Sequence, residues 1–88
     1  TDLQRITRSK DASARIALAQ RPFTPALATL AVDKSVKVRL AVAAQPASSD
    51  EILRVLAGDS NVKVRAAVYS NPSASDETKA IAALLGIK

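Results

Sequence analysis

The chain has 88 residues, 48% of them hydrophobic, and a formal net charge of +5. A chain of this length forms one domain, and its start at Thr1 rather than Met leads us to expect a piece of a longer protein. The absence of Cys and His excludes disulfides, thiolate metal sites and the usual general base of neutral pH, and no apolar run approaches the roughly 20 residues that a membrane-spanning helix needs.

Composition and charge are both uneven. Ala, Val, Leu and Ile dominate the apolar residues, and Phe23 and Tyr69 are the only aromatic ones, which favours thin, closely packed helices. Residues 1–45 contain eight Lys or Arg against three Asp or Glu, whereas residues 46–88 contain five of each kind. A basic N-terminal half raises the question of a nucleic acid or an acidic partner.

Helical periodicity first predicts a short helix over residues 2–8 and a longer one over 12–20. Asp11 precedes the longer helix and can accept a hydrogen bond from an orphan N–H group of its first turn. Pro22 follows it, and because proline disfavours helix in the residue before it, the helix is expected to end there.

The next two predicted helices, over 25–32 and 36–44, repeat this arrangement. The second of them lies between the capping residue Ser35 and the stop signal Pro46.

A third pair of helices is predicted over 50–57 and 62–70. Ser48 and Glu51 fit a capping box at the start of the first. Asn61 and Pro72 bound the second in the same way as the corresponding residues of the earlier helices.

The last predicted helix spans residues 76–86 and departs from the pattern. Ser75 and two acidic residues open it, which suits the positive end of a helix. Lys79 stands where an apolar residue is expected, so the predicted core positions are Ile81, Leu84 and Leu85. Such a helix is typical of a terminal cap or of the end of an array.

The longer helices contain a twelve-residue block that recurs at offsets of 24 and 26 residues. We name them B helices, and the shorter helices before them A helices. The first column of the block holds N-cap residues, the middle columns have helical i, i+3, i+4 spacing, and the last holds proline. The columns are Asp11, Ser35 and Asn61; Ala14, Val38 and Val64; Ala17, Ala41 and Ala67; Leu18, Val42 and Val68; and Pro22, Pro46 and Pro72.

One A–B pair is too small to bury its own apolar face, whereas stacked pairs bury a continuous core. The sequence therefore predicts an all-α fold, an α-solenoid of about three and a half two-helix repeats. The expected repeats within the single domain 1–88 are 2–22, 25–46 and 50–72, followed by the terminal helix 76–86.

The repeat resembles the leucine-rich repeat variant, a bacterial relative of HEAT-like repeats. The residues that carry the resemblance are Leu30-Ala31-Val32-Asp33 with Val36 to Val42, and Leu56-Ala57-Gly58-Asp59 with Val62 to Pro72. The first repeat departs from the pattern, with Ser9 in place of the aspartate. The resemblance implies a right-handed array of alternating α and short, 3₁₀-like helices, and a role in binding proteins or, in a few relatives, DNA. Some members hold an iron–sulfur cluster on cysteines; this chain has no Cys, so no cofactor is carried over.

An arginine recurs in every block, as Arg15, Arg39 and Arg65. Three guanidinium groups in a row could bind phosphates along a groove. The favoured interpretation is structural, because Asp33 and Asp59 each precede an arginine of the ladder by six residues and could form an ion pair with it. The first repeat lacks this aspartate, so Arg15 is expected to be the freest of the three.

Other residues could contact a partner. Lys37 and Lys63 share a column in the first turn of a B helix, where a cation is slightly unfavourable for the helix; they serve either solubility or contact with an acidic partner. Tyr69 replaces a small residue of its column and serves either binding or space filling. The basic cluster at the N-terminus is either a solvated face or a binding end; it comprises Arg5, Arg8, Lys10, Arg15 and Arg21.

Catalysis has no visible basis, since the acidic residues outside the ladder lie at caps or turns and no Gly-rich loop or metal-ligand cluster is present. We therefore expect a non-enzymatic, cytoplasmic module for protein–protein interaction or scaffolding, without cofactor, metal or membrane. The alternatives are a nucleic-acid-binding repeat that uses the basic N-terminal half, and a structural cap or spacer of a longer solenoid. The candidate partner-binding residues are Lys37, Lys63, Tyr69, Arg15 and Arg8, with Leu40 as a further B-helix residue.

Overall fold

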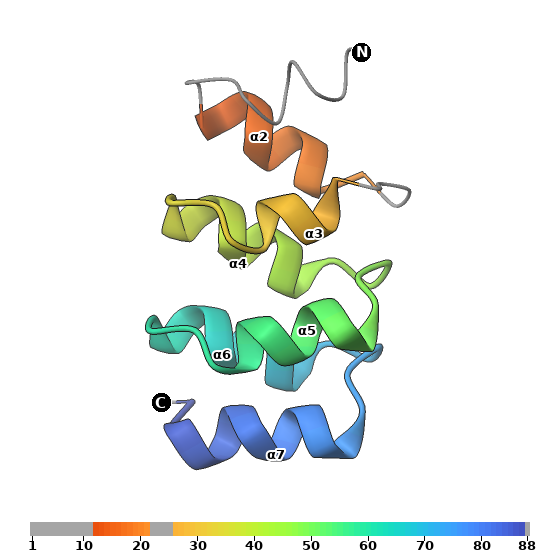
Figure 1. Ribbon diagram of the computed structural model, residues 1–88, viewed down its shortest axis with the longest axis vertical. Helices are drawn as coiled ribbons and strands as arrows, with labels where there is room; N and C mark the ends of the chain where they lie inside the picture. Colours follow the sequence, from red (N-terminus) through yellow and green to blue (C-terminus); the bar gives the residue numbers. More distant parts are fainter. Residues whose placement is uncertain (1–11, 22–25, 88) are drawn as a thin grey trace.

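The computed structural model describes residues 12–21 and 26–87. This part of the chain is all-helical and contains no strand. Figure 1 shows the helices following one another along the long axis of the molecule, which measures 37 × 20 × 14 Å. The helices are α2 (Ala12–Ala19), α3 (Leu27–Leu30), α4 (Val36–Ala44), α5 (Asp50–Ala57), α6 (Val62–Ser70) and α7 (Asp76–Leu85).

The B helices α2, α4 and α6 confirm the predicted spans to within one residue. Pro46 and Pro72 each come directly after the C-cap residue of a B helix, as expected from the bias of proline against helix in the preceding residue. The A helices α5 and α7 also match, whereas α3 has four residues instead of the predicted span 25–32. The helix predicted over 2–8, the cap Asp11 and the stop signal Pro22 lie outside the described residues.

The turn from A helix to B helix has the same hydrogen bonds in two repeats. After α3, the N–H groups of Val32 and Asp33 donate to carbonyls three residues back, at 3.3 and 3.1 Å. After α5, Gly58 and Asp59 do the same at 3.2 and 3.0 Å. These tighter bonds end each A helix and turn the chain into the following B helix.

Each helix packs against helices of the neighbouring repeat. Among the B helices, α4 contacts both α2 and α6, and among the A helices α5 contacts α7. The two sets also contact each other, since α3 packs on α4 and α6 packs on both α5 and α7. The core between them consists of small and branched aliphatic side chains, which are Leu18, Leu27, Leu30, Val38, Val42, Leu53, Leu56, Val64, Val68 and several alanines.

Of the three predicted core residues of α7, Ile81 is half-buried against the core, whereas the prediction is wrong for Leu84 and Leu85. Leu84 and Leu85 are 85% and 55% exposed, whereas Thr78 and Ala82 are fully buried. The buried face of α7 is the one that carries Thr78, whose hydroxyl donates to Asp50 of α5 at 2.8 Å.

The predicted capping box of Ser48 and Glu51 at α5 is wrong, because the helix begins one residue later than that box requires and Ile52 stands at the position where the box needs Glu or Gln. Ser49, not Ser48, is the N-cap, and its Oγ accepts from the N–H of Ile52 at 3.3 Å. Ser48 is buried instead and donates its hydroxyl to the carbonyl of Val42 at 2.8 Å. Ser75 caps α7 as predicted, accepting from the N–H of Thr78.

Candidate interaction surface

The arginine ladder is built from ion pairs between repeats. Arg15 Nε donates to Asp33 Oδ2 at 2.8 Å, and Arg39 Nε donates to Asp59 Oδ2 at 2.7 Å. The predicted carboxylate pairing within a repeat, of Asp33 with Arg39 and of Asp59 with Arg65, is therefore wrong. Arg39 reaches its own repeat through Nη1, which donates to the backbone carbonyl of Asp33 at 2.7 Å.

Each ladder aspartate also shapes the start of a B helix. Asp33 accepts from the N–H of Ser35 at 2.8 Å, and Asp59 accepts from the N–H of Asn61 at 2.9 Å. Asn61 in turn accepts from the N–H of Lys63 at 2.8 Å, as an N-cap should. Ser35 occupies the predicted N-cap position of α4, but its side chain makes no capping bond. Asp33 and Asp59 thus join one B helix to the first turn of the next.

The expectation that Arg15 is the freest of the three arginines is wrong. Its side chain pairs with Asp33, and the residue is only 4% exposed. The aspartate missing from its own repeat does not matter, because the following repeat supplies the partner. Arg65 donates to two backbone carbonyls instead of a carboxylate, from Nε to that of Gly86 at 2.8 Å and from Nη1 to that of Asp59 at 2.6 Å.

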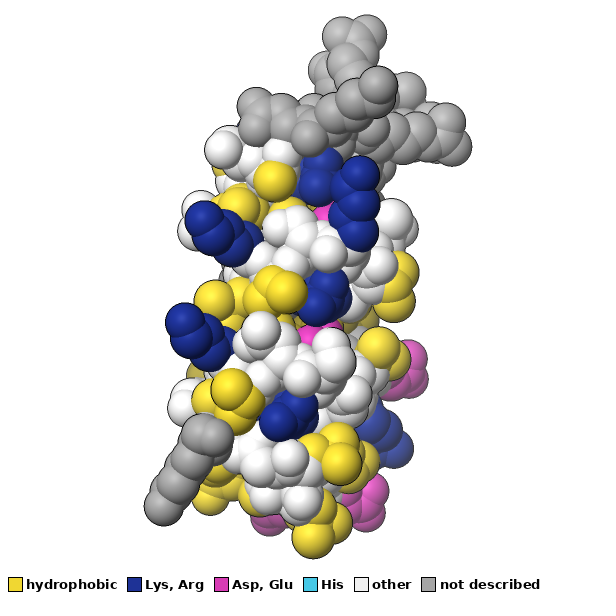
Figure 2. Space-filling model, turned by 90° about the vertical axis from the view of Figure 1, so that its left-hand side faces the viewer, with side chains coloured by type: hydrophobic (Ala, Val, Ile, Leu, Met, Phe, Trp, Pro, Cys, Tyr) yellow, Lys and Arg dark blue, Asp and Glu magenta, His cyan; other side chains and the backbone are white. Residues whose placement is uncertain are grey.

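The two kinds of helix differ in charge. The B helices contain five basic residues and no acidic one: Arg15, Lys37, Arg39, Lys63 and Arg65. The A helices α5 and α7 contain four acidic and two basic residues: Asp50, Glu51, Asp76, Glu77, Arg54 and Lys79. Figure 2 shows basic side chains spread along one face of the molecule, with acidic side chains between the central ones and more acidic ones toward its right-hand and lower edges. The described B helices therefore carry only positive charges, whereas α5 and α7 carry a net negative charge.

Three lysines on the basic side are available to a partner. Lys37 and Lys63 are exposed at equivalent places in α4 and α6, and Lys34 is exposed in the turn before α4. No hydrogen bond or ion pair joins their side chains to another described residue. Tyr69 is 44% exposed on α6, and Leu40 is half-buried on α4. Arg8, the remaining predicted contact residue, lies outside the described residues.

A ladder of amides, which the sequence reasoning missed, joins the other ends of the B helices. Gln45 Nε2 donates to the carbonyls of Ala19 and Arg21, both at 3.1 Å. One repeat later, Asn71 Nδ2 donates to the carbonyls of Ala43 and Gln45, both at 2.9 Å. The signal was available in the sequence, since an amide residue directly precedes proline in both repeats. These bonds satisfy carbonyls that a helix end leaves without partners.

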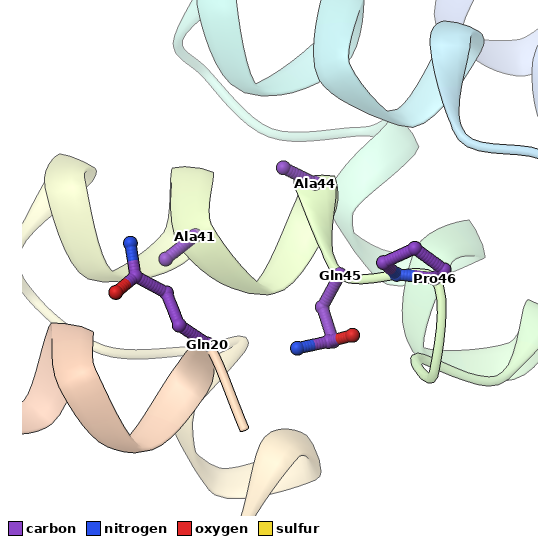
Figure 3. A pocket seen from close by; sticks show the side chains of 5 residues that line it. All are labelled: Gln20, Ala41, Ala44, Gln45 and Pro46. Carbon is purple, nitrogen blue, oxygen red and sulfur yellow. The ribbon is translucent and has the colours of Figure 1, made fainter. Parts of the chain in front are cut away.

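Figure 3 shows an open depression beside this amide ladder, with a volume of about 260 Å³. The described residues that line it are Gln20, Ala41, Ala44, Gln45 and Pro46. None of them is ionisable, and the side-chain Oε1 of Gln45 already accepts from the N–H of Ala47 at 3.2 Å. The lining therefore offers no acid, base or nucleophile.

Asp50 is the centre of a polar cluster between α5 and α7. Its carboxylate accepts from the N–H of Ser75 and the hydroxyl of Thr78, both at 2.8 Å, and from the hydroxyl of Ser75 at 3.1 Å. The backbone bond from Ser75, followed by the bond from Thr78, lowers the pKa of Asp50, because each stabilises the ionised form. Arg54 adds a weaker contact at 3.4 Å.

Replacing Asp50 with Asn is expected to destabilise the protein at pH 7 and to destabilise it less at pH 3. A lowered pKa in the folded state contributes stability above the unfolded pKa, and that contribution is lost as pH falls through the folded value. Urea unfolding at both pH values measures the difference between the two proteins. The control is Asp76→Asn, at the equivalent exposed position of α7, which should cost little at either pH. A difference for Asp50→Asn that does not shrink at pH 3 contradicts this prediction.

Within the described residues no group of His, Cys, Asp and Glu side chains could hold a metal ion, and no helix is long and apolar enough to cross a membrane. Comparisons with protein-family models, curated proteins and solved structures found no match. The resemblance to the leucine-rich repeat variant therefore rests on the residues that carry it.

Proposed function

We propose that the chain is a right-handed α-solenoid of about three and a half two-helix repeats, and that it is a non-enzymatic module that binds an acidic protein. The solenoid is supported by the recurring contacts: equivalent residues of successive repeats make the same Arg–Asp pairs and the same amide–carbonyl bonds. In such proteins the stacked helices present an extended surface for a partner.

The charge of the B helices is the observation that carries the binding role. Arg15 and Arg39 are paired with Asp33 and Asp59, but Lys37 and Lys63 are exposed at equivalent positions of helices that contain no acidic residue. A lysine in the first turn opposes the helix dipole, so helix stability does not account for these residues. A positive surface of this kind favours and steers a negatively charged partner.

An acidic protein fits this surface better than a nucleic acid does. The guanidinium groups of Arg15 and Arg39 are occupied by Asp33 and Asp59, which removes two of the strongest candidates for phosphate contact. Tyr69 is the only aromatic residue on the described B helices, and stacking on aromatic side chains is a main source of affinity for single strands.

Charge reversal tests the proposal. We expect a labelled Glu-rich peptide to bind at low salt, and Lys37→Glu or Lys63→Glu to weaken that binding about three- to tenfold, since one surface pair contributes about 0.2–1 kcal/mol and reversal adds repulsion. Lys79→Glu is the matched control, because it makes the same charge change on an A helix. Fluorescence anisotropy at two salt concentrations measures the affinities.

Two results would overturn the proposal. One is the absence of any peptide binding at low salt. The other is binding of duplex or single-stranded DNA of equal charge, with a steep salt dependence, at concentrations where the peptide does not bind; that result would assign the surface to nucleic acid.

A further inference from the structure

The spacing of the two exposed B-helix lysines points to the shape of the partner. Lys37 and Lys63 occupy the same place in α4 and α6, which pack directly against each other. Packed helices lie about 8–10 Å apart, so the two side chains leave the surface about that far from each other along the stack.

From this spacing we propose that the partner segment is extended, runs along the stack across α4 and α6, and carries carboxylates three residues apart. The proposal rests on the protein-binding function proposed above. A polyproline II segment has three residues per turn and rises about 3.1 Å per residue, so every third side chain lies on one side at intervals of about 9 Å. Two glutamates at i and i+3 can therefore face Lys37 and Lys63 together.

The surface beside the lysines suits such a segment. Leu40 and Ala41 lie one turn beyond Lys37, and Ala66 and Ala67 lie one turn beyond Lys63; all four are half-buried. They form an apolar strip that is mostly alanine, and the backbone of a partner segment can approach the helices closely along it. The ladder carboxylates of Asp33 and Asp59 are already paired with arginines and so oppose an acidic segment only weakly.

The competing occupant is an acidic helix laid along the same line. At 1.5 Å per residue, glutamates at i and i+7 of a helix are about 10.5 Å apart and match the same lysines. A helix, however, is about 10–12 Å wide with its side chains and needs a broad apolar groove to bury its own face. The strip beside Lys37 and Lys63 consists mostly of alanine on two neighbouring helices, which favours the thinner extended chain.

Three peptides of equal charge distinguish these arrangements. The first has four Glu-Pro-Pro units, the second has the same composition with its four glutamates at every second position, and the third is helical with four glutamates at seven-residue intervals. We expect the first to bind the intact chain about threefold or more tightly than either of the others, because only it engages both lysines in a favourable geometry. Lys63→Met should abolish this preference while leaving weak binding of all three, and Lys79→Met should leave the preference unchanged.

The outcomes separate this inference from the function on which it rests. Equal binding of the first and second peptides would overturn the extended arrangement and leave the acidic-protein function standing. Tighter binding of the helical peptide would also overturn it and assign the surface to a helix. Failure of all three peptides to bind would overturn both. Far-UV circular dichroism of each variant, measured alongside, establishes that a loss of preference comes from the surface and not from unfolding.

Discussion

Replacing Asp59 with alanine is expected to destabilise the folded chain by about 3 kcal/mol or more, because it removes one partner of a largely buried ion pair. The side chains of Asp59 and Arg39 are 8% and 15% exposed, and they are joined at 2.7 Å. The substitution leaves the guanidinium of Arg39 without its carboxylate and also removes the acceptor for the N–H of Asn61. A loss of this size is a large part of the roughly 5–15 kcal/mol that stabilises a small domain.

Urea unfolding followed by circular dichroism measures this loss, and for a chain of this size the melting temperature should fall by more than about 10 °C. Glu51→Ala is the matched control: it removes an exposed acidic residue from α5, and its cost should stay below about 1 kcal/mol. Adding Arg39→Met to Asp59→Ala should recover part of the stability, since the unpaired buried charge disappears. A cost for Asp59→Ala similar to that of Glu51→Ala would show that the ladder contributes little to the fold.

The helices were predictable because their signals are local. The cap residue, the apolar residues at i, i+3 and i+4, and the proline that ends each B helix all lie within twelve residues, and α4 and α6 begin and end where these signals place them. The length of α3 was not predictable in this way. Its last turn gives way to i to i+3 bonds that lead into the turn carrying Asp33.

The pairing of the arginine ladder depends on stacking, which short-range sequence spacing does not encode. Asp33 is six residues from Arg39 and eighteen from Arg15, and sequence spacing alone favours the nearer partner. In the fold, the turn that carries Asp33 places its carboxylate beside α2 and its carbonyl beside Arg39. One residue thus serves two arginines through different atoms, an arrangement that only the packing of adjacent repeats determines.

The sequence predicted individual contact residues, but it did not predict which helices bring them together. Counting charge along the chain assigned the basic character to the N-terminal half, because a long window averages A and B helices together. In the structure the basic residues lie on the B helices. Lys63, from the half of the sequence without net charge, therefore occupies the same position on α6 as Lys37, from the basic half, does on α4. Arg15, by contrast, was predicted to contact a partner, whereas in the structure it is buried.

Replacing Asn71 with alanine is expected to cost about 2–4 kcal/mol, because the amide makes three bonds where water has little access. Asn71 is 3% exposed; its Nδ2 donates to the carbonyls of Ala43 and Gln45, and its Oδ1 accepts from the N–H of Ser73 at 2.8 Å. Alanine would leave two carbonyls at the end of α4 and one N–H group without partners, and unsatisfied buried groups cost about 1–3 kcal/mol each.

Two further substitutions at Asn71 separate its hydrogen bonds from its volume, with stability measured by urea unfolding. Asn71→Asp keeps the shape but points a carboxylate oxygen at two carbonyl oxygens, so we expect it to destabilise at least as much as alanine does. Asn71→Gln should be the mildest change, because Gln45 makes the same pair of bonds in the preceding repeat. If Asn71→Asp proves as mild as Asn71→Gln, the two amide donors do not stabilise this joint. The contacts between α4 and α6 would then depend on the packing of their aliphatic side chains alone.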